Sequence, residues 1–305
     1  MNKILLIGGS TGVGKTKLAC LCQEKYNGYL ISCDSMQIYK DMNIGTAKLT
    51  KDEQIKYPHA LIDIIEPNVE FSVADYCQKA KVEIEKAQKQ NKLPILVGGT
   101  GLYMKSLLFP YSFSKTLKDD TLREEYKNLA KEYGNEYVYN ILKGLDPIRA
   151  SELHYNDLKR VIRSLEILKT NGKIENNENK QSIYSYELIV LTTDREVLYN
   201  RINNRVDEMF NEGLIKEVKD VIKKYNLTSV HQSMKAIGYR EFFDYFNGTK
   251  TLEEVKEKIK QDSRNYAKRQ ITWFKTMPKA KFFEIENLDE IINYLNKSLG
   301  VVWVI

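Results

Sequence analysis

The stretch GGSTGVGKT, residues 8–16, directly follows the apolar run ILLI and has the residue types and spacing of a phosphate-binding loop. Gly9, Gly14, Lys15 and Thr16 satisfy the pattern G-x-x-x-x-G-K-[ST]. Its glycines permit a tight turn that directs several backbone N–H groups at one anion, and Lys15 adds a full charge. Thr16 is suited to hold Mg²⁺ against phosphate oxygens. We expect a di- or triphosphate to bind through Gly9, Ser10, Thr11, Gly12, Val13, Gly14, Lys15 and Thr16.

This loop does not specify a reaction, and the next polar residue leaves several roles open. Asp34 ends the apolar segment YLISCDS. In small-molecule kinases an acid at this place is the general base on the acceptor, whereas in P-loop ATPases it holds Mg²⁺. An exposed aspartate at a strand end is the plain structural alternative. No NKxD-type guanine-binding pattern occurs in the chain.

The elements that position these residues alternate between strand and helix. Short apolar runs predict strands at 3–7, 29–35, 60–65 and 93–101, and helices are expected at 15–26, at 72–90 and from residue 102. Ser72 and Asp75 form a capping-box pattern. Such alternation is typical of a parallel sheet covered on both faces, with ligands beyond the carboxyl ends of its strands. The segments GGSTGVGKT, CDSMQ and GGTG are therefore expected along one edge.

Between residues 115 and 185 the pattern becomes helical, with a polar loop expected at 172–182. ELIVLTT (187–193) is expected to return to the sheet, and the chain is then helical until AKFFEI (280–285). We predict an α/β fold with a P-loop NTPase-like parallel sheet core, residues 1–114 and 186–305, and an inserted all-helical domain, residues 115–185.

Composition indicates an ordinary globular protein with a localised basic region. The net charge is +6, and residues 250–282 hold ten Lys/Arg against four Asp/Glu, so the remainder is balanced at 37 of each. This basic segment fits either a polyanionic partner or a solvated helix face. No run approaches the roughly 20 apolar residues of a membrane span. We expect a cytoplasmic monomer without a signal peptide, with its four cysteines as buried free thiols.

Six segments occur in the order typical of the bacterial tRNA isopentenyltransferase family: GGSTGVGKT, ISCDSMQIYKDMNIGTAK, PHALIDI, LPILVGGTGLY, NDLKRVIRSLEI and AKRQITWFK. The chain resembles that family over nearly its whole length, and the second segment is far more specific than the phosphate loop. The resemblance implies transfer of a dimethylallyl group from dimethylallyl diphosphate to N6 of an adenosine. That adenosine (position 37) lies 3′ of the anticodon in tRNAs reading codons that begin with U. Diphosphate would then be a leaving group, with Mg²⁺ as cofactor.

The resemblance also implies roles for individual residues. Asp34 would be the general base, and Thr11 and Arg205 would contact the bridging oxygen of the bond that breaks. The implied contacts to the tRNA anticodon stem-loop are Asp34, Ser35, Met36, Gln37, Thr100, Arg123, Lys159, Arg160, Val161, Ile162, Arg163, Lys235 and Arg240. On the stripe pattern of residues 263–275, Lys268 and Arg269 are further phosphate contacts.

The phosphate loop departs from the family pattern, which usually has Pro after its first essential glycine and Ala-Ser before Gly14. Ser10, Gly12 and Val13 stand in that stretch here, which predicts a looser loop.

Three other functions compete with tRNA prenylation. A small-molecule or nucleoside kinase would use the same loop for ATP, and a related enzyme class prenylates free adenosine nucleotides. Neither of these needs the helical insertion or the basic segment. A non-catalytic RNA-binding protein would not need the complete set of polar residues at the sheet edge.

Overall fold

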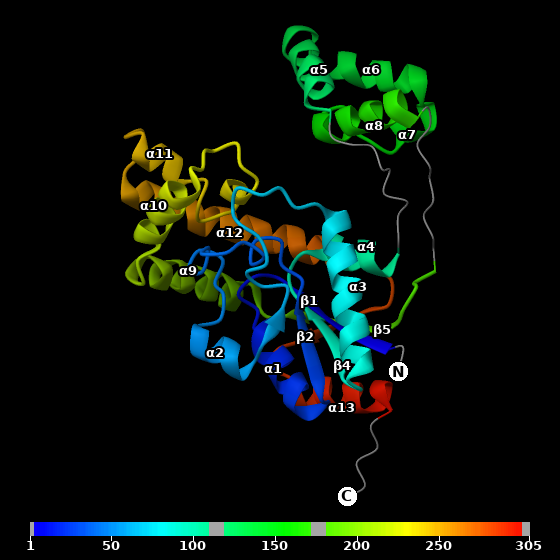
Figure 1. Ribbon diagram of the computed structural model, residues 1–305, viewed down its shortest axis with the longest axis vertical. Coiled ribbons are helices and arrows are strands. Elements are labelled where there is room, and N and C mark those ends of the chain that lie inside the picture. Colours follow the sequence, from blue (N-terminus) through cyan, green and yellow to red (C-terminus); the bar gives the residue numbers. More distant parts are fainter. Residues whose placement is uncertain (1–2, 110–118, 172–180, 301–305) are drawn as a thin grey trace, which may run out of the picture. The chain divides into compact units, whose positions relative to one another are not determined.

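The computed structural model describes residues 3–109, 119–171 and 181–300 (Figure 1). The chain divides into two compact units, Met1–Phe109 with Ser182–Ile305 and Pro110–Gln181. Within the described ranges, every helix is too short or too polar to span a membrane.

A parallel sheet of six strands forms the centre of the first unit. Its order is β3-β2-β4-β1-β5-β6. The strands are β1 (Lys3–Gly9), β2 (Gly28–Ser32), β3 (His59–Ala60), β4 (Leu93–Val97), β5 (Ser185–Thr192) and β6 (Ala280–Glu284). Ile4 and Leu6 face one core while Leu5 and Ile7 face the other, and all four are fully buried. Burial on both faces explains why the strands are continuous apolar runs.

Helices cover both faces of this sheet (Figure 1). The helices α3 (Val73–Lys89) and α4 (Gly101–Leu108) pack on one face, and α1 (Lys15–Lys25) and α13 (Leu288–Leu299) pack on the other. The further helices of this unit are α2 (Lys51–Lys56), α9 (Arg195–Asn211), α10 (Leu214–Tyr225), the 3₁₀ turn η1 (Ser233–Lys235), α11 (Phe242–Phe246) and α12 (Leu252–Phe274).

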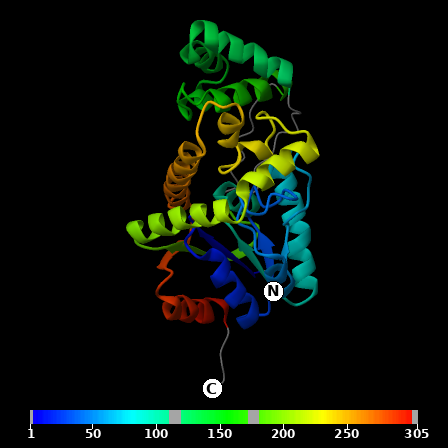
Figure 2. The same ribbon diagram turned by 90° about the vertical axis from the view of Figure 1, so that its left-hand side faces the viewer.

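The long helix α12 supplies side chains to both cores. Its first turn is closed by a capping box between Thr251 and Glu254. Ala267 is buried in the core with α1, and Phe274 is buried in the core with α3. Helix α9 packs against α12, and Figure 2 shows the two helices, yellow-green and orange, crossing beside the sheet.

Most of the predicted elements are confirmed, including the capping box of Ser72 and Asp75 at the start of α3. The strand expected at 60–65 is wrong, because only His59 and Ala60 pair with β2. Leu61 and Asp63 have φ angles of +67° and +55°, which break an extended backbone. Of the four cysteines, Cys20 is half-buried and the other three are buried, and all are free thiols as expected.

The second unit is helical in all of its described elements. These are α5 (Asp120–Tyr133), α6 (Asn135–Leu145), α7 (Pro147–Ser151) and α8 (Leu158–Asn171). They share a small core of Ala130, Val138, Leu142, Ala150, Val161, Ile162 and Leu165. The predicted fold class, a parallel α/β core with a helical insert, is confirmed. The expected boundary at 114/115 and nearly all of the expected loop at 172–182 lie outside the described residues.

The chain leaves and re-enters the first unit at one point. The backbone N–H of Ile183 donates to the carbonyl of Leu108 at 3.0 Å. The parts of the first unit that precede and follow the helical segment in the sequence are therefore hydrogen-bonded to each other where that segment begins and ends.

The interior of β4 is fully buried at Ile95 and Leu96. Leu96 is fully buried there, so Leu96→Ala should lower the free energy of unfolding by about 2–5 kcal/mol through lost burial and a cavity. Urea unfolding followed by circular dichroism measures this change. Val82→Ala is the control, because the Val82 side chain on α3 is 57% exposed. A stability of Leu96→Ala equal to that of the control would contradict the packing described here.

Candidate functional site

Three loops that follow β1, β2 and β4 meet at the carboxyl edge of the sheet. The N–H of Cys33 donates to the carbonyl of Val97 (2.7 Å), and the N–H of Thr100 donates to the carbonyl of Cys33 (3.2 Å). A Cβ atom at Gly98 would lie 2.1 Å from the carbonyl oxygen of Cys33. Only glycine fits between these two loops, so the GGTG sequence is explained by close backbone approach.

The phosphate loop has the conformation that its glycines predict. Gly12 and Gly14 have φ angles of +78° and +99°, which L side chains rarely adopt. Helix α1 begins at Lys15, directly behind this turn. The ammonium of Lys15 donates to the carbonyl of Ser10 at 2.7 Å and so lies folded over the loop. Backbone amides, a helix N-terminus and a cation therefore meet where an anion would bind.

A buried glutamine on α12 joins this loop to the neighbouring one. Gln270 Oε1 accepts the backbone N–H of Thr11 at 2.8 Å, and Gln270 Nε2 donates to the carbonyl of Gly99 at 3.0 Å. The side chain of Gln270 thus satisfies one polar backbone group of each loop. Because unpaired buried polar groups are costly, this amide fixes the distance between the two loops.

Two cavities adjoin at this edge, of ≈ 330 Å³ and ≈ 110 Å³. Both are lined by Thr11, Asp34, Thr46, Arg205 and Tyr266. The larger cavity also holds Ser35, Met36, Lys235, Arg240 and Arg269, and the smaller holds Lys15, Thr16 and Gln37. The phosphate loop and most of the expected RNA contacts of this unit therefore line two cavities that have these five residues in common.

Asp34 and Arg205 both line these cavities. Asp34 Oδ1 accepts the backbone N–H groups of Met36 (2.8 Å) and Gln37 (3.3 Å), which orients the carboxylate at the start of its turn. Arg205 on α9 donates to Thr11 Oγ1 and to the carbonyl of Ala47, both at 3.4 Å. Arg201, one turn earlier on α9, forms an ion pair with Glu286 (3.2 Å).

The charges at the edge influence one another. Burial lowers the pKa of Lys15 to about 8, and Arg205 adds to this effect while the Asp34 carboxylate opposes it. Burial also lowers the pKa of Arg205, again opposed by Asp34. The site therefore contains two desolvated cations around one carboxylate and favours a multiply charged anion.

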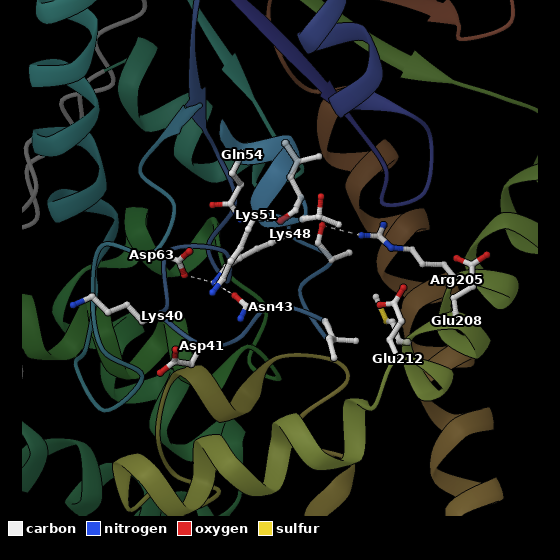
Figure 3. A pocket seen from close by; sticks show the side chains of 15 residues that line it. Lys40, Asp41, Asn43, Lys48, Lys51, Gln54, Asp63, Arg205, Glu208 and Glu212 are labelled. Carbon is white, nitrogen blue, oxygen red and sulfur yellow. Dashed lines mark hydrogen bonds and ion pairs between the residues drawn. The ribbon is translucent and has the colours of Figure 1, made fainter. Parts of the chain in front are cut away.

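A third cavity, of ≈ 630 Å³, is also lined by Arg205 (Figure 3). In Figure 3 the side chains of Lys40, Asp63 and Lys48 lie across the hollow from Arg205 and Glu208. The ammonium of Lys48 is fully buried and pairs with Asp63. Arg205 thus lines all three cavities.

The other expected RNA contacts of this unit differ in their surroundings. Thr100 Oγ1 accepts the backbone N–H of Ser35 at 3.1 Å and so supports the wall behind Asp34. Arg240 pairs with Glu241 (2.8 Å) and Asp262 (2.5 Å). Lys268 and Arg269 are exposed on α12, with Lys268 stacked over the Tyr199 ring at 5.9 Å.

Gln37 is among the residues expected to contact the tRNA, and its side-chain amide is hydrogen-bonded within the protein. Gln37 Nε2 donates to the carbonyls of Thr46 (3.1 Å) and Ala47 (3.3 Å). Direct reading of a base by this nitrogen would require exchange of those hydrogen bonds.

The expected contacts on the second unit divide into two groups. Arg123 and Arg163 both pair with the buried carboxylate of Glu166. Burial opposes ionisation of Glu166, but hydrogen bonds from these arginines hold its pKa below its usual value. Lys159 and Arg160 are exposed on α8. The side chains of Val161 and Ile162 are buried in the helical core, so the expectation that they contact RNA is corrected to a packing role.

Sequence reasoning missed Tyr266, Gln270 and Thr46. Burial, and then the charge of Asp34, raise the pKa of Tyr266 to about 12, so its hydroxyl stays protonated beside that carboxylate. Gln270 carried one available signal, because it lies on the apolar stripe of α12 with Ala267 and Phe274. A polar residue on a buried stripe indicates a specific hydrogen-bonding role.

The pKa of Lys15 generates a test. An alkyl diphosphate favours the charged ammonium, so binding must raise this pKa from about 8 and take up protons near pH 8. Affinity should fall as the pH rises through that value. Calorimetry at pH 8 in two buffers of different ionisation enthalpy measures the uptake. Lys15→Arg, charged at every pH, is the control and should abolish most of it; equal uptake in both proteins would contradict the assignment to Lys15.

Comparisons with known proteins agree with this geometry. Residues 37–277 match the family model described as IPP transferase. The chain is 46% identical to a tRNA dimethylallyltransferase of Thermoanaerobacter sp. (strain X514), covering 98% of this chain and 99% of that protein.

Two solved structures are also similar. A tRNA isopentenylpyrophosphate transferase of Bacillus halodurans has a TM-score of 0.74 at 40% identity, covering 98% of this chain and 96% of that one. A eukaryotic dimethylallyltransferase described as acting on tRNA has a TM-score of 0.83 at 28% identity, covering 98% and 79%. The phosphate loop, the carboxylate that lines the same cavity and these similarities over nearly the whole chain have one explanation: the chain belongs to the IPP transferase family of tRNA dimethylallyltransferases.

Proposed function

We propose that this enzyme, a transferase acting on tRNA, moves the dimethylallyl group of dimethylallyl diphosphate to N6 of adenosine 37, beside the anticodon of tRNAs that read codons beginning with U. One observation carries the proposal. Asp34, Thr11 and Arg205 line both adjoining cavities. The smaller cavity contains residues of the phosphate loop, and the larger contains the basic side chains of Lys235, Arg240 and Arg269. An isoprenoid diphosphate and a base extruded from an RNA loop would meet there.

The chemistry requires a base for the incoming amine. The lone pair of N6 is delocalised into the purine, so the amine is a weak nucleophile. As the N6–C1 bond forms and the C1–O bond to diphosphate breaks, Asp34 accepts the proton that N6 loses. Its Oδ1 accepts hydrogen bonds from two backbone N–H groups. These neutral donors fix the orientation of the carboxylate. Such general-base assistance contributes about 10²–10⁴-fold.

The departing diphosphate gains negative charge, and the chain offers donors for it. We assign the loop amides and Lys15 to its oxygens and Thr11 with Arg205 to the bridging oxygen. Mg²⁺ is commonly held by one or two protein oxygens together with phosphate oxygens. The exposed Thr16 hydroxyl lies on the same cavity as the Asp34 carboxylate and fits that donor set. When bound, the ion would neutralise charge on the leaving group.

Binding of RNA is supported by basic side chains at the ≈ 330 Å³ cavity and on α12. Lys235, Arg240 and Arg269 line the ≈ 330 Å³ cavity, and Lys268, the residue before Arg269, is also exposed on α12. On the helical segment expected at 115–185, we assign RNA contacts to Arg123, Lys159, Arg160 and Arg163. Phosphate contacts of this kind position an RNA without reading its sequence.

A transfer assay tests the proposal. The enzyme is incubated with labelled dimethylallyl diphosphate and either an anticodon stem-loop or AMP, and label is expected in the RNA alone. Label in AMP alone would overturn the proposal.

Asp34→Asn should lower the transfer rate by about 10²–10⁴-fold, because the amide cannot accept the N6 proton. Stem-loop affinity, measured by filter binding, should stay within about threefold, since most RNA contact comes from phosphates. Asp52→Asn on the exposed side of α2 is the matched control. Unchanged turnover in Asp34→Asn would remove the base assignment.

Lys268→Ala with Arg269→Ala should weaken stem-loop binding and reduce the slope of log affinity against log salt by about one unit per lost phosphate contact. The control removes two exposed lysines, Lys89 at the end of α3 and Lys297 on α13, for an equal change of charge. Lys89 is the last residue of α3 and Lys297 lies in the last turn of α13, and both helices run back from the site edge. Identical slopes in the two double variants would show that Lys268 and Arg269 face away from the RNA.

A further inference from the structure

A carboxylate on α10 holds a loop that no part of the chemistry above explains. Glu217 Oε2 accepts the backbone N–H groups of Asn43 (2.9 Å) and Ile44 (2.8 Å), and Glu217 Oε1 accepts that of Gly45 (3.0 Å). The hydroxyl of the fully buried Tyr239 donates to Oε1 at 2.7 Å. Three consecutive amides and a phenol thus converge on one half-buried carboxylate, the arrangement of a backbone anion nest.

The loop itself is tightly fitted around this contact. A Cβ atom at Gly45 would lie 2.5 Å from the ring of Tyr239, so the backbone packs directly on that ring. Thr46 Oγ1 donates to the carbonyl of Met42 at 2.6 Å. At the far end, the buried ammonium of Lys48 donates to Asn43 Oδ1 at 3.2 Å, as Figure 3 shows. The segment from Asn43 to Lys48 is therefore fixed at both ends.

The same segment presents two carbonyl groups to residues of the site. The carbonyls of Thr46 and Ala47 accept both hydrogen bonds of Gln37 Nε2, and the Ala47 carbonyl also accepts one from Arg205. Arg205 reaches Thr11 Oγ1 from that position. A displacement of the 43–47 backbone would therefore misplace Gln37 and Arg205 together.

We propose that Glu217 is a positioning residue for transfer: it seats the amides of residues 43–45 and thereby directs the carbonyls that orient Arg205 and Gln37. This inference rests on the proposed function of those two residues. Glu217 itself lines neither the ≈ 110 Å³ cavity that Arg205 and Gln37 share nor the adjoining ≈ 330 Å³ cavity. Burial, followed by the neighbouring Glu217 charge, raises the pKa of Tyr239 far above its usual value, so the phenol remains a donor to the carboxylate.

The test compares Glu217→Ala and Glu217→Gln with Asp220→Asn, an exposed carboxylate on the same helix. In Glu217→Ala, amide hydrogen exchange of residues 43–45 should accelerate while the melting curve shows a folded protein. Its kcat should fall by about 10²-fold, the effect of a displacement of about 1 Å at a reacting centre. Affinity for an alkyl diphosphate should change by less than about threefold, because the loop amides and Lys15 are untouched.

Glu217→Gln should recover part of both readouts, since its amide oxygen still accepts two of the three N–H groups. A double-mutant cycle with Gln37→Ala should be non-additive in kcat/KM for the stem-loop by about 0.5 kcal/mol or more, roughly a 2.3-fold departure from additivity. Asp220→Asn should match the parent chain in every measurement.

Three results would overturn the proposal. Unchanged exchange at residues 43–45 in Glu217→Ala would show that the carboxylate does not hold the loop. Faster exchange with kcat unchanged would show a loop contact without influence on the reaction. Effects that add to those of Gln37→Ala would show that the influence of Glu217 does not pass through Gln37. Because exchange needs no substrate, a parent enzyme that transferred no label would instead contradict the proposed function, and the exchange result would still decide the role of Glu217 in the loop.

Discussion

Everything at the site depends on how closely three backbone loops approach one another at the carboxyl edge of the sheet. Parallel strands deliver their following loops to the same edge. Hydrogen bonds between backbone groups at Cys33, Val97 and Thr100 then leave no space for a side chain at Gly98. The side chain of Gln270 spans the remaining gap from the phosphate loop. The close packing of the loop backbones therefore determines the position of each functional side chain.

Burial of charge is the second requirement. Lys15 and Arg205 are partly stripped of water, and Asp34 is the nearby carboxylate that offsets their repulsion. In such an environment a phosphate chain replaces water as the partner of both cations, and the interaction is stronger than at an open surface. The desolvation that strengthens binding of a phosphate chain also lowers the pKa of Lys15 to about 8, which lies within the pH range of ordinary assays.

Much of the fold was predictable because its signals are local. The phosphate loop, the capping box of α3 and the apolar strands each depend on residues within a few positions of one another. The strand expected at 60–65 failed because an apolar run cannot reveal the positive φ angle of Leu61. Gln270 and Glu217 were missed for the opposite reason. Their partners lie 259 and about 173 residues away, so no spacing in the sequence relates them.

The junction between Leu108 and Ile183 has an evolutionary consequence. Where a polypeptide departs from and returns to a domain at hydrogen-bonded neighbours, the intervening segment can change in size without straining the domain that carries it. Descendants of a common ancestor could thus enlarge, shorten or remodel the helical excursion while the catalytic framework stayed intact. A change in the length of that segment would leave the sheet and the loops at its carboxyl edge in place.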